Sequence, residues 1–147
     1  MYRRILVATD GSTLSKKAVR SSIDLAAATG AELVALHVVP RFPMSYIEGA
    51  LTISREEVAR TEKQWHEQGQ AIVDRVREAA ASEGVKAKAM VAHSDMVAES
   101  ILAAAKKHKC DLIVMASHGR KGIKRLLLGS ETQHVLTHGS LPVLVLR

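Results

Sequence analysis

Short apolar runs alternate along this chain with longer segments of helical periodicity. The apolar runs predict five strands, at residues 5–8, 32–39, 85–92, 112–116 and 143–146. Between them, apolar positions spaced three and four apart predict helices over 13–29, from Ser54 to Gly84, after Ser94 or Asp95, and over 130–138. Strands that alternate with helices are typical of an α/β fold, with a parallel sheet covered by helices on both faces.

The second predicted helix has a clear start and a long apolar stripe. Ser54 and Glu57 have the S-x-x-E spacing of a capping box, in which each side chain bonds the backbone N–H of the other residue. The stripe expected to face the sheet consists of Val58, Trp65, Ile72, Val76 and Ala79. We therefore expect a long amphipathic helix here.

Two segments beside this helix have a different pattern. Lys86 and Lys88 alternate with small apolar residues in the third strand, which suits an edge strand with one face in water. Residues 40–54 hold two of the three prolines and show no periodicity. Because loops of this length are uncommon in compact domains, we expect this segment to move as a lid.

Length and composition narrow the class of protein. A chain of 147 residues suits a single domain, here 1–147. The formal net charge of +6 favours anionic partners. Cys110 is the only cysteine, so no disulfide can form within the chain and a reducing compartment is expected. The apolar runs are too short to span a bilayer, and the first strand begins too early to leave room for a signal peptide, so we expect a cytoplasmic protein that does not enter a membrane.

Polar, glycine-containing sequence follows two of the predicted strands. The first strand ends in Thr9-Asp10-Gly11-Ser12 and the fourth in Ser117-His118-Gly119. If the strand order is 3-2-1-4-5, these two strands are neighbours, and the order reverses between them. Ligands of open parallel sheets bind at such a point, beyond the carboxyl ends of the strands.

The segment after the fourth strand has the parts of a phosphate site. Gly119 and Gly129 permit close approach of the backbone and positive φ angles. Ser130 opens a helix whose N-terminus attracts anions, and it is placed to cap that helix. Nearby cations are Arg120, Lys121, Lys124 and Arg125. The same residues are equally consistent with an ordinary strand-to-helix connection and a solvated basic loop, and Asp10 with a turn residue.

Other kinds of site find less support. His134 and His138 lie four residues apart, as metal ligands can, but no third ligand is evident. No Ser-His-Asp or Cys-His arrangement is recognisable, and we interpret Cys110 as structural. A nucleic-acid partner is not expected, because the chain lacks an aromatic stacking platform and a known reader motif.

Taken together, these motifs resemble the universal stress protein family over nearly the whole chain. The resemblance includes the start Ile5–Ser12, the strand Leu36–Val39, the run Asp111–Gly119, Leu128-Gly129-Ser130 and the ending Pro142–Val145. Nucleotide-binding members carry G-x2-G-x9-G-[S/T] after the fourth strand. Gly119, nine further residues and Gly129-Ser130 match its second half, but Ala116 replaces the first glycine. An alanine there fits without strain if the position is extended in the strand.

The resemblance implies a Rossmann-like, adenine nucleotide alpha hydrolase-like fold with five parallel strands in the order 3-2-1-4-5. It implies a stress-response or signalling module that binds ATP or another adenine nucleotide, with Mg²⁺ as an optional companion. Thr9 and Asp10 would meet the base and ribose with Ala8 beside them, and the Val38 backbone would read the adenine edge. Met115 and Ala116 would lie under the nucleotide. The phosphates would be surrounded by Ser117, His118, Gly119, Gly129, Ser130 and Thr132. Glu131 would repel a phosphate if it turned inward, so we expect it to point to solvent.

The family is generally homodimeric through its last strand, and the apolar run at residues 143–146 permits such pairing. Two alternatives remain open: a slow ATPase, and a member that Ala116 prevents from binding nucleotide and that acts through protein partners. An ATP-pyrophosphatase would need a Ser-Gly-Gly-x-Asp-Ser loop that is not present here. A receiver domain of two-component signalling would need further acidic residues beside Asp10 and a phosphoacceptor Asp after the third strand.

Overall fold

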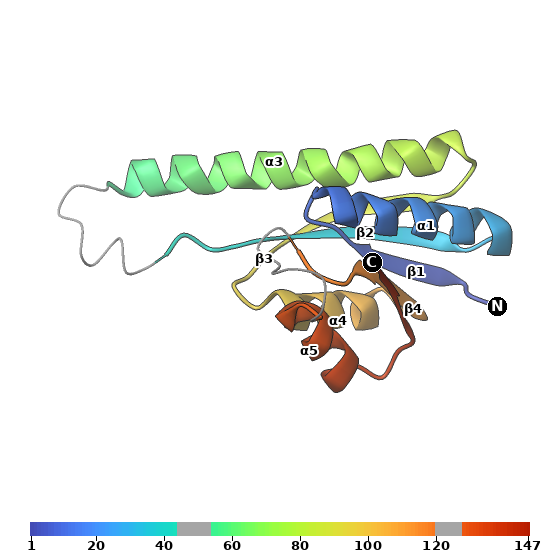
Figure 1. Cartoon of the computed structure of the whole chain (residues 1–147). Helices are drawn as coiled ribbons and strands as arrows, with labels where there is room; N and C mark the ends of the chain where they lie inside the picture. Colours follow the sequence, from blue (N-terminus) through green and yellow to red (C-terminus); the bar gives the residue numbers. More distant parts are fainter. Residues whose placement is uncertain (44–53, 120–127) are drawn as a thin grey trace.

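The computed structural model describes residues 1–43, 54–119 and 128–147 and contains a five-stranded parallel sheet (Figure 1). The strand order is β3-β2-β1-β4-β5, which confirms the predicted α/β fold and strand order. The strands are β1 (Arg4–Ala8), β2 (Glu32–Val39), β3 (Ala87–His93), β4 (Leu112–Ala116) and β5 (Val143–Leu146). Since β1 pairs with both β2 and β4, the order reverses beside β1, as predicted.

Helices cover both faces of this sheet. They are α1 (Thr13–Thr29), α3 (Arg55–Ser82), α4 (Val97–Lys107) and α5 (Ser130–His138). Figure 1 shows α1 and α3 along one face, with α4 and α5 on the other. Each face has its own buried core, and successive residues of the central strands alternate between the two: Ile5 and Val7 enter one core, Leu6 the other.

Local signals set several helix ends. The predicted capping box at the start of α3 is present: Glu57 N–H donates to Ser54 Oγ, and Ser54 N–H donates to Glu57 Oε2. Gly30 closes α1 with φ 72°, a left-handed conformation that favours glycine. At the start of α4 the prediction was wrong, because the N-cap is Met96 rather than Ser94 or Asp95, and Met96 makes no side-chain cap.

The buried face of α3 also differs from the predicted stripe. Its buried residues are Gly69, Val73, Val76 and Ala80, whereas Ile72 and Ala79 remain outside the core. No residue of the described part of α3 before Gly69 is buried, and Figure 1 shows this end of the helix reaching past the strands. Val58 and Trp65 of the predicted stripe are half-buried in this half, so the stripe faces the expected way, but the sheet does not extend far enough to bury it.

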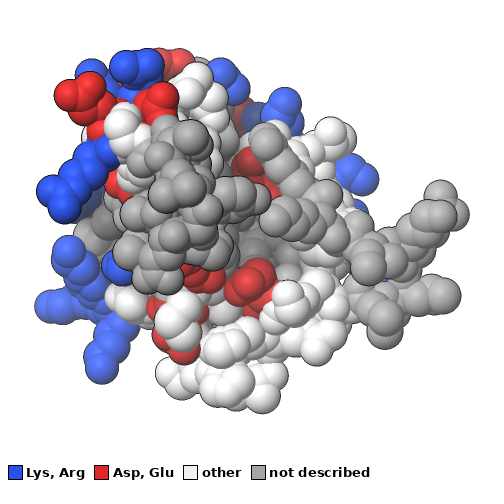
Figure 2. Space-filling model, turned by 90° about the vertical axis from the view of Figure 1, so that its left-hand side faces the viewer, with Lys and Arg blue, Asp and Glu red and all other residues white. Residues whose placement is uncertain are grey.

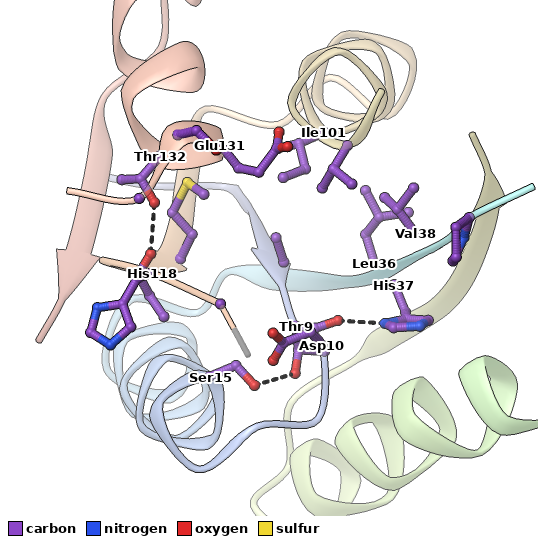
Figure 3. A pocket seen from close by; sticks show the side chains of 18 of the residues that line it. Thr9, Asp10, Ser15, Leu36, His37, Val38, Ile101, His118, Glu131 and Thr132 are labelled. Carbon is purple, nitrogen blue, oxygen red and sulfur yellow. Dashed lines mark hydrogen bonds between the residues drawn. The ribbon is translucent and has the colours of Figure 1, made fainter. Parts of the chain in front are cut away.

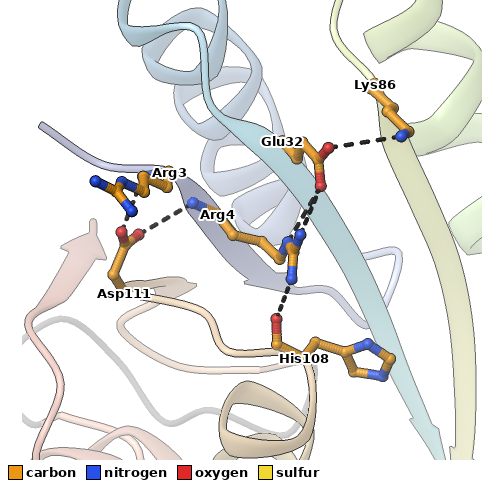
Figure 4. Close-up of polar contacts among 6 residues, drawn as sticks. All are labelled: Arg3, Arg4, Glu32, Lys86, His108 and Asp111. Atoms are coloured by element: carbon orange, nitrogen blue, oxygen red, sulfur yellow. Dashed lines mark hydrogen bonds and ion pairs between the residues drawn. The ribbon is translucent and has the colours of Figure 1, made fainter.

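Polar contacts hold the amino end of the sheet together (Figure 4). Arg4 Nη2 lies 3.0 Å from Glu32 Oε2, and its Nη1 donates to the carbonyl oxygen of His108. The carboxylate of Asp111 accepts the backbone N–H of Arg4. Arg4, and then Lys86, lower the pKa of Glu32 by stabilising its carboxylate. These contacts join β1, β2 and the end of α4 at the edge opposite the predicted site.

The structure tests the predicted edge strand but not most of the predicted lid. The third strand is an edge strand as predicted, and none of its residues is fully buried. The predicted lid at residues 40–54 lies largely outside the described residues, since 44–53 are not among them. Within the described ranges, no helix combines the length and apolar character needed to cross a membrane.

Candidate functional site

A cavity of about 750 Å³ opens at the carboxyl ends of the strands, where the strand order reverses (Figure 3). Its walls come from β1, β2, β4 and the first turns of α4 and α5. All but one of the site residues expected from sequence line it: Ala8, Thr9, Asp10, Val38, Met115, Ala116, His118, Gly119, Gly129, Ser130, Glu131 and Thr132. The exception is Ser117. The fold therefore brings segments more than 100 residues apart in the sequence into one site.

The turn after β1 is held by its own side chains. Thr9 is 6% exposed, and its hydroxyl lies 3.0 Å from Ser15 Oγ and accepts the N–H of Gly11. Asp10 Oδ1 accepts the N–H of Ser12 at 2.9 Å, which makes an Asx turn. Figure 3 shows Thr9 and Asp10 at the cavity wall, so the turn presents a carboxylate in a fixed position.

Backbone bonds fix the segment after β4 against the start of α5. Ser117 N–H donates to the Leu146 carbonyl of β5, and Gly129 N–H donates to the Ser117 carbonyl, both at 2.7 Å. Ser117 Oγ also lies 3.1 Å from His118 Nδ1. Ser117 thus connects β5 to the start of α5 and does not line the cavity. Ala116 is the last residue of β4, so it is extended and fits there without strain.

The two motif glycines, Gly119 and Gly129, allow neighbouring atoms to approach the backbone closely, and neither has an unusual φ angle. Neither lies among the glycines with positive φ, so the freedom to adopt a left-handed conformation is not used here. A Cβ on Gly129 would lie 3.0 Å from His118 Cα and 3.2 Å from the Ser117 carbonyl oxygen. A Cβ on Gly119 would lie 3.0 Å from Asp10 Oδ2. A side chain at Gly129 would push against the backbone of 117–118, which passes directly beside it.

Two predictions at the start of α5 need correction. The N-cap is Gly129, so Ser130 is the first helical residue and makes no capping bond. Glu131 is exposed overall, but its Oε2 accepts the N–H of Ala98 at 2.9 Å and it lines the cavity. Its carboxylate caps α4, which lacks a cap of its own, because a helix N-terminus attracts negative charge.

Sequence reasoning missed a second group of lining residues, mostly apolar, which includes Ser15, Leu36, His37, Pro40, Ser94, Asp95, Val97, Ile101 and Leu128. His37 Nδ1–H donates to the Thr9 carbonyl oxygen at 2.8 Å, which joins β2 to the turn after β1. Ile101 has the helical spacing of a core residue, and nothing local reveals that its helix also walls a cavity. The wall of the cavity that contains Ile101 is therefore formed only when the chain folds.

The described lining residues carry three carboxylates, those of Asp10, Asp95 and Glu131, and neither Lys nor Arg. Figure 2 shows Asp and Glu side chains near the middle of this face and Lys and Arg around its periphery. The cations predicted beside the phosphates, Arg120, Lys121, Lys124 and Arg125, lie outside the described residues. The N-terminus of α5, which carries a partial positive charge, lies at this wall together with Glu131 of its own first turn.

Metal and cysteine chemistry find no support at this site. Within residues 1–43, 54–119 and 128–147, no group of three or more His, Cys, Asp or Glu is placed to hold a metal ion. The rings of His134 and His138 stack with centroids 4.1 Å apart. Cys110 is 6% exposed, and burial raises the pKa of its thiol to about 11.

The comparisons with known proteins agree with this architecture. The model of the universal stress protein family matches residues 1–147. Universal stress protein YxiE of Bacillus subtilis is 33% identical, with each chain covered in full. The structure of MJ0577 from Methanocaldococcus jannaschii has a TM-score of 0.84 at 26% identity, covering 99% of this chain and 96% of that one. A universal stress protein solved in complex with cAMP has a TM-score of 0.72 at 22% identity, covering 99% and 97%.

Proposed function

This chain belongs to the universal stress protein family, and from that premise we propose that its large cavity binds an adenine nucleotide, with ATP as the proposed ligand. The observation that carries the proposal is the close packing of Gly129 and the N-terminus of α5 against the end of β4, beside Asp10. A helix N-terminus at the point where the strand order reverses is suited to phosphate.

We assign roles according to the chemistry of each wall. The α5 N-terminus, with the N-cap Gly129 and the hydroxyl of Ser130, is proposed to hold phosphate. Asp10 is proposed to accept hydrogen bonds from the ribose, as a carboxylate does from paired hydroxyls. The aliphatic side chains of Val38, Ile101 and Met115 are proposed to enclose the base, since a planar ring gains most from apolar burial.

Charge bears on which form of the nucleotide enters. Three carboxylates on the described wall oppose a polyphosphate unless positive charge accompanies it. Mg²⁺ commonly binds through one or two carboxylates together with substrate phosphates. We therefore propose that ATP binds with Mg²⁺, and that a ligand with fewer charges, such as the cAMP of the related structure, binds without it.

Calorimetric titration of the full chain tests the proposal. Wild type is titrated with ATP with and without Mg²⁺, AMP, cAMP and GTP. We expect adenine nucleotides to bind more tightly than GTP, and Asp10→Ala to weaken ATP and adenosine alike. Wild type that binds no adenine nucleotide at millimolar concentration contradicts the proposal. If Ala116→Gly then restores binding, Ala116 has disabled the site, and the alternative of a member acting through protein partners is favoured.

We propose a binding module with little or no catalysis, and slow ATP hydrolysis is the alternative. The two are separated by following phosphate release from saturating ATP over hours, with Asp10→Ala as the matched control. Release by wild type that the variant abolishes favours the ATPase. Equal, background release by both favours the binding module.

We also propose that two copies pair along β5, with the whole chain acting as one domain in the cytoplasm. The Pro142 carbonyl accepts the N–H of Ile113 in β4, and the Leu146 carbonyl accepts that of Ser117 just after it. By alternation, the backbone groups of Val143 and Val145 therefore point away from β4. On that side the described residues leave β5 as the edge of the sheet. Unpaired strand edges are commonly satisfied by a second chain.

A further inference from the structure

A second, smaller cavity of about 170 Å³ lies between α1 and α3, beside the turn that ends β1. One side is formed by this turn and α1, and the other by about two turns of α3. Of the lining residues described for the two cavities, Thr9 is common to both, so its side chain separates them. Figure 1 shows α1 and α3 lying along the same face of the sheet.

The floor of this cavity explains the mismatch in the α3 stripe. Ile72 and Ala79 have the spacing of core residues, but the sheet-facing positions are taken by their neighbours Val73 and Ala80. Ile72 and Ala79 instead line the groove, together with half-buried Val19 of α1. Apolar side chains are thus left facing a cavity with no described side chain covering them.

The rim of the cavity is positively charged. Lys16 of α1 and Arg75 of α3 line it, and among the described residues neither side chain has an ion-pair partner. On the same helices Arg20 is paired with Asp24 and Glu83, and Arg77 with Asp74, whereas Lys17, Arg55 and Arg60 have no ion pair among the described residues. Lys16 and Arg75 are therefore two of several unneutralised charges on these helices, and they are the two that line the cavity.

The start of α1 adds to the positive potential. Gly11 lines the cavity one residue before the N-cap Ser12, and the first turn of α1 contains no acidic residue, although the Asp10 carboxylate bonded to the Ser12 N–H offsets part of the charge. A helix N-terminus carries a partial positive charge that an acidic residue in the first turn would offset. The cavity thus combines two unpaired cations, a helix N-terminus and an aliphatic floor.

We propose that this cavity is a second ligand site, which binds a short-chain carboxylate. The carboxylate would lie between Lys16 and Arg75, whose guanidinium matches its geometry, and the chain against Val19 and Ile72. At the ≈30 Å³ that a water molecule occupies in the liquid, the volume holds about six non-hydrogen atoms, the number in butyrate. The site is distinct from the nucleotide cavity and does not depend on what occupies it.

Titration of the ¹⁵N-labelled full chain, followed by NMR at constant ionic strength without nucleotide, tests this site. The probes are sodium butyrate, sodium phosphate, which lacks the chain, and 1-butanol, which lacks the charge. We expect butyrate to cause saturable shifts at the amides of Gly11, Lys16 and Val76. Phosphate and 1-butanol should bind at least about tenfold more weakly than butyrate, because phosphate lacks the apolar chain and 1-butanol lacks the charge.

Matched variants separate this site from general attraction to a basic protein. Lys16→Gln and Arg75→Gln should each weaken butyrate by about fivefold or more, the effect of losing one charge-assisted hydrogen bond. Lys17→Gln removes the same charge from the next, exposed residue of α1 and should leave affinity unchanged. The proposal is overturned if the shifts do not saturate, if phosphate binds as tightly as butyrate, or if Lys17→Gln matches Lys16→Gln.

Discussion

Thr132 Oγ1 donates a hydrogen bond of 2.9 Å to the carbonyl oxygen of Ala116, and this bond ties the first turn of α5 to the end of β4. Both residues are buried, with Thr132 1% and Ala116 8% exposed. The bond holds the N-terminus of α5 at the cavity, where its free N–H groups face the proposed phosphate position. The Thr132–Ala116 hydrogen bond thereby holds in place the part of the cavity wall that we propose contacts phosphate.

Removing this hydroxyl should cost stability. Thr132→Val keeps the shape of the side chain but deletes the donor, so we expect the free energy of unfolding to fall by about 1 kcal/mol, the net value of a typical hydrogen bond. Urea unfolding followed by circular dichroism measures the change. An unchanged midpoint and slope would show that the bond contributes nothing.

Ser130→Ala should lower ATP affinity and leave stability nearly unchanged. Ser130 is exposed and caps nothing, so stability should stay within about 0.5 kcal/mol of wild type. ATP affinity should fall by about five- to tenfold, which corresponds to one hydrogen bond to a charged group. Calorimetric titration of both variants checks the contrast. A stability loss without an affinity loss would remove Ser130 from the proposed site.

Gly129→Ala should weaken binding of the phosphates and leave binding of the base unchanged. The added Cβ meets the backbone of His118 and Ser117, so the segment must shift away from the start of α5. With φ at −59°, alanine itself is not strained there. We expect ATP affinity to fall by about tenfold or more, equal to 1.4 kcal/mol, while adenosine affinity is unchanged. Equal losses for both ligands would contradict the assigned role.

Val145→Pro should disrupt the proposed dimer. Proline removes the N–H that points to the free edge of β5, whereas the control Val145→Ala keeps it. In sedimentation velocity at micromolar concentration, wild type and Val145→Ala should be dimers and Val145→Pro a monomer. A monomeric wild type would refute pairing along β5.

Cys110 should resist thiol reagents in the folded protein. A pKa raised to about 11 keeps the thiol protonated well above neutral pH, and the nucleophile is the thiolate. At pH 8 we expect slow labelling of native protein and rapid labelling in urea, where burial is lost. As pH rises toward 11, native labelling should accelerate. Fast native labelling at pH 8 would show that the thiol is accessible.

The sequence by itself determined the order and extent of most elements. The bounds of α1, β2, β4 and β5 coincide with those predicted, because apolar runs, helical periodicity and Gly30 are local signals. The glycine-containing turns at two strand ends predicted where the larger cavity lies, because parallel strands all end at the same edge of a sheet. The capping box at Ser54 is equally local.

Only the tertiary structure decided which faces those elements present. The angle at which α3 lies on the sheet selects Val73 and Ala80 over Ile72 and Ala79, and periodicity cannot distinguish adjacent stripes. Glu131 caps α4 from a different helix, 33 residues away from Ala98, so no local pattern reveals it. The aliphatic wall at Ile101 and the groove between α1 and α3 arise in the same way, because each is made by surfaces that meet only when the chain is folded.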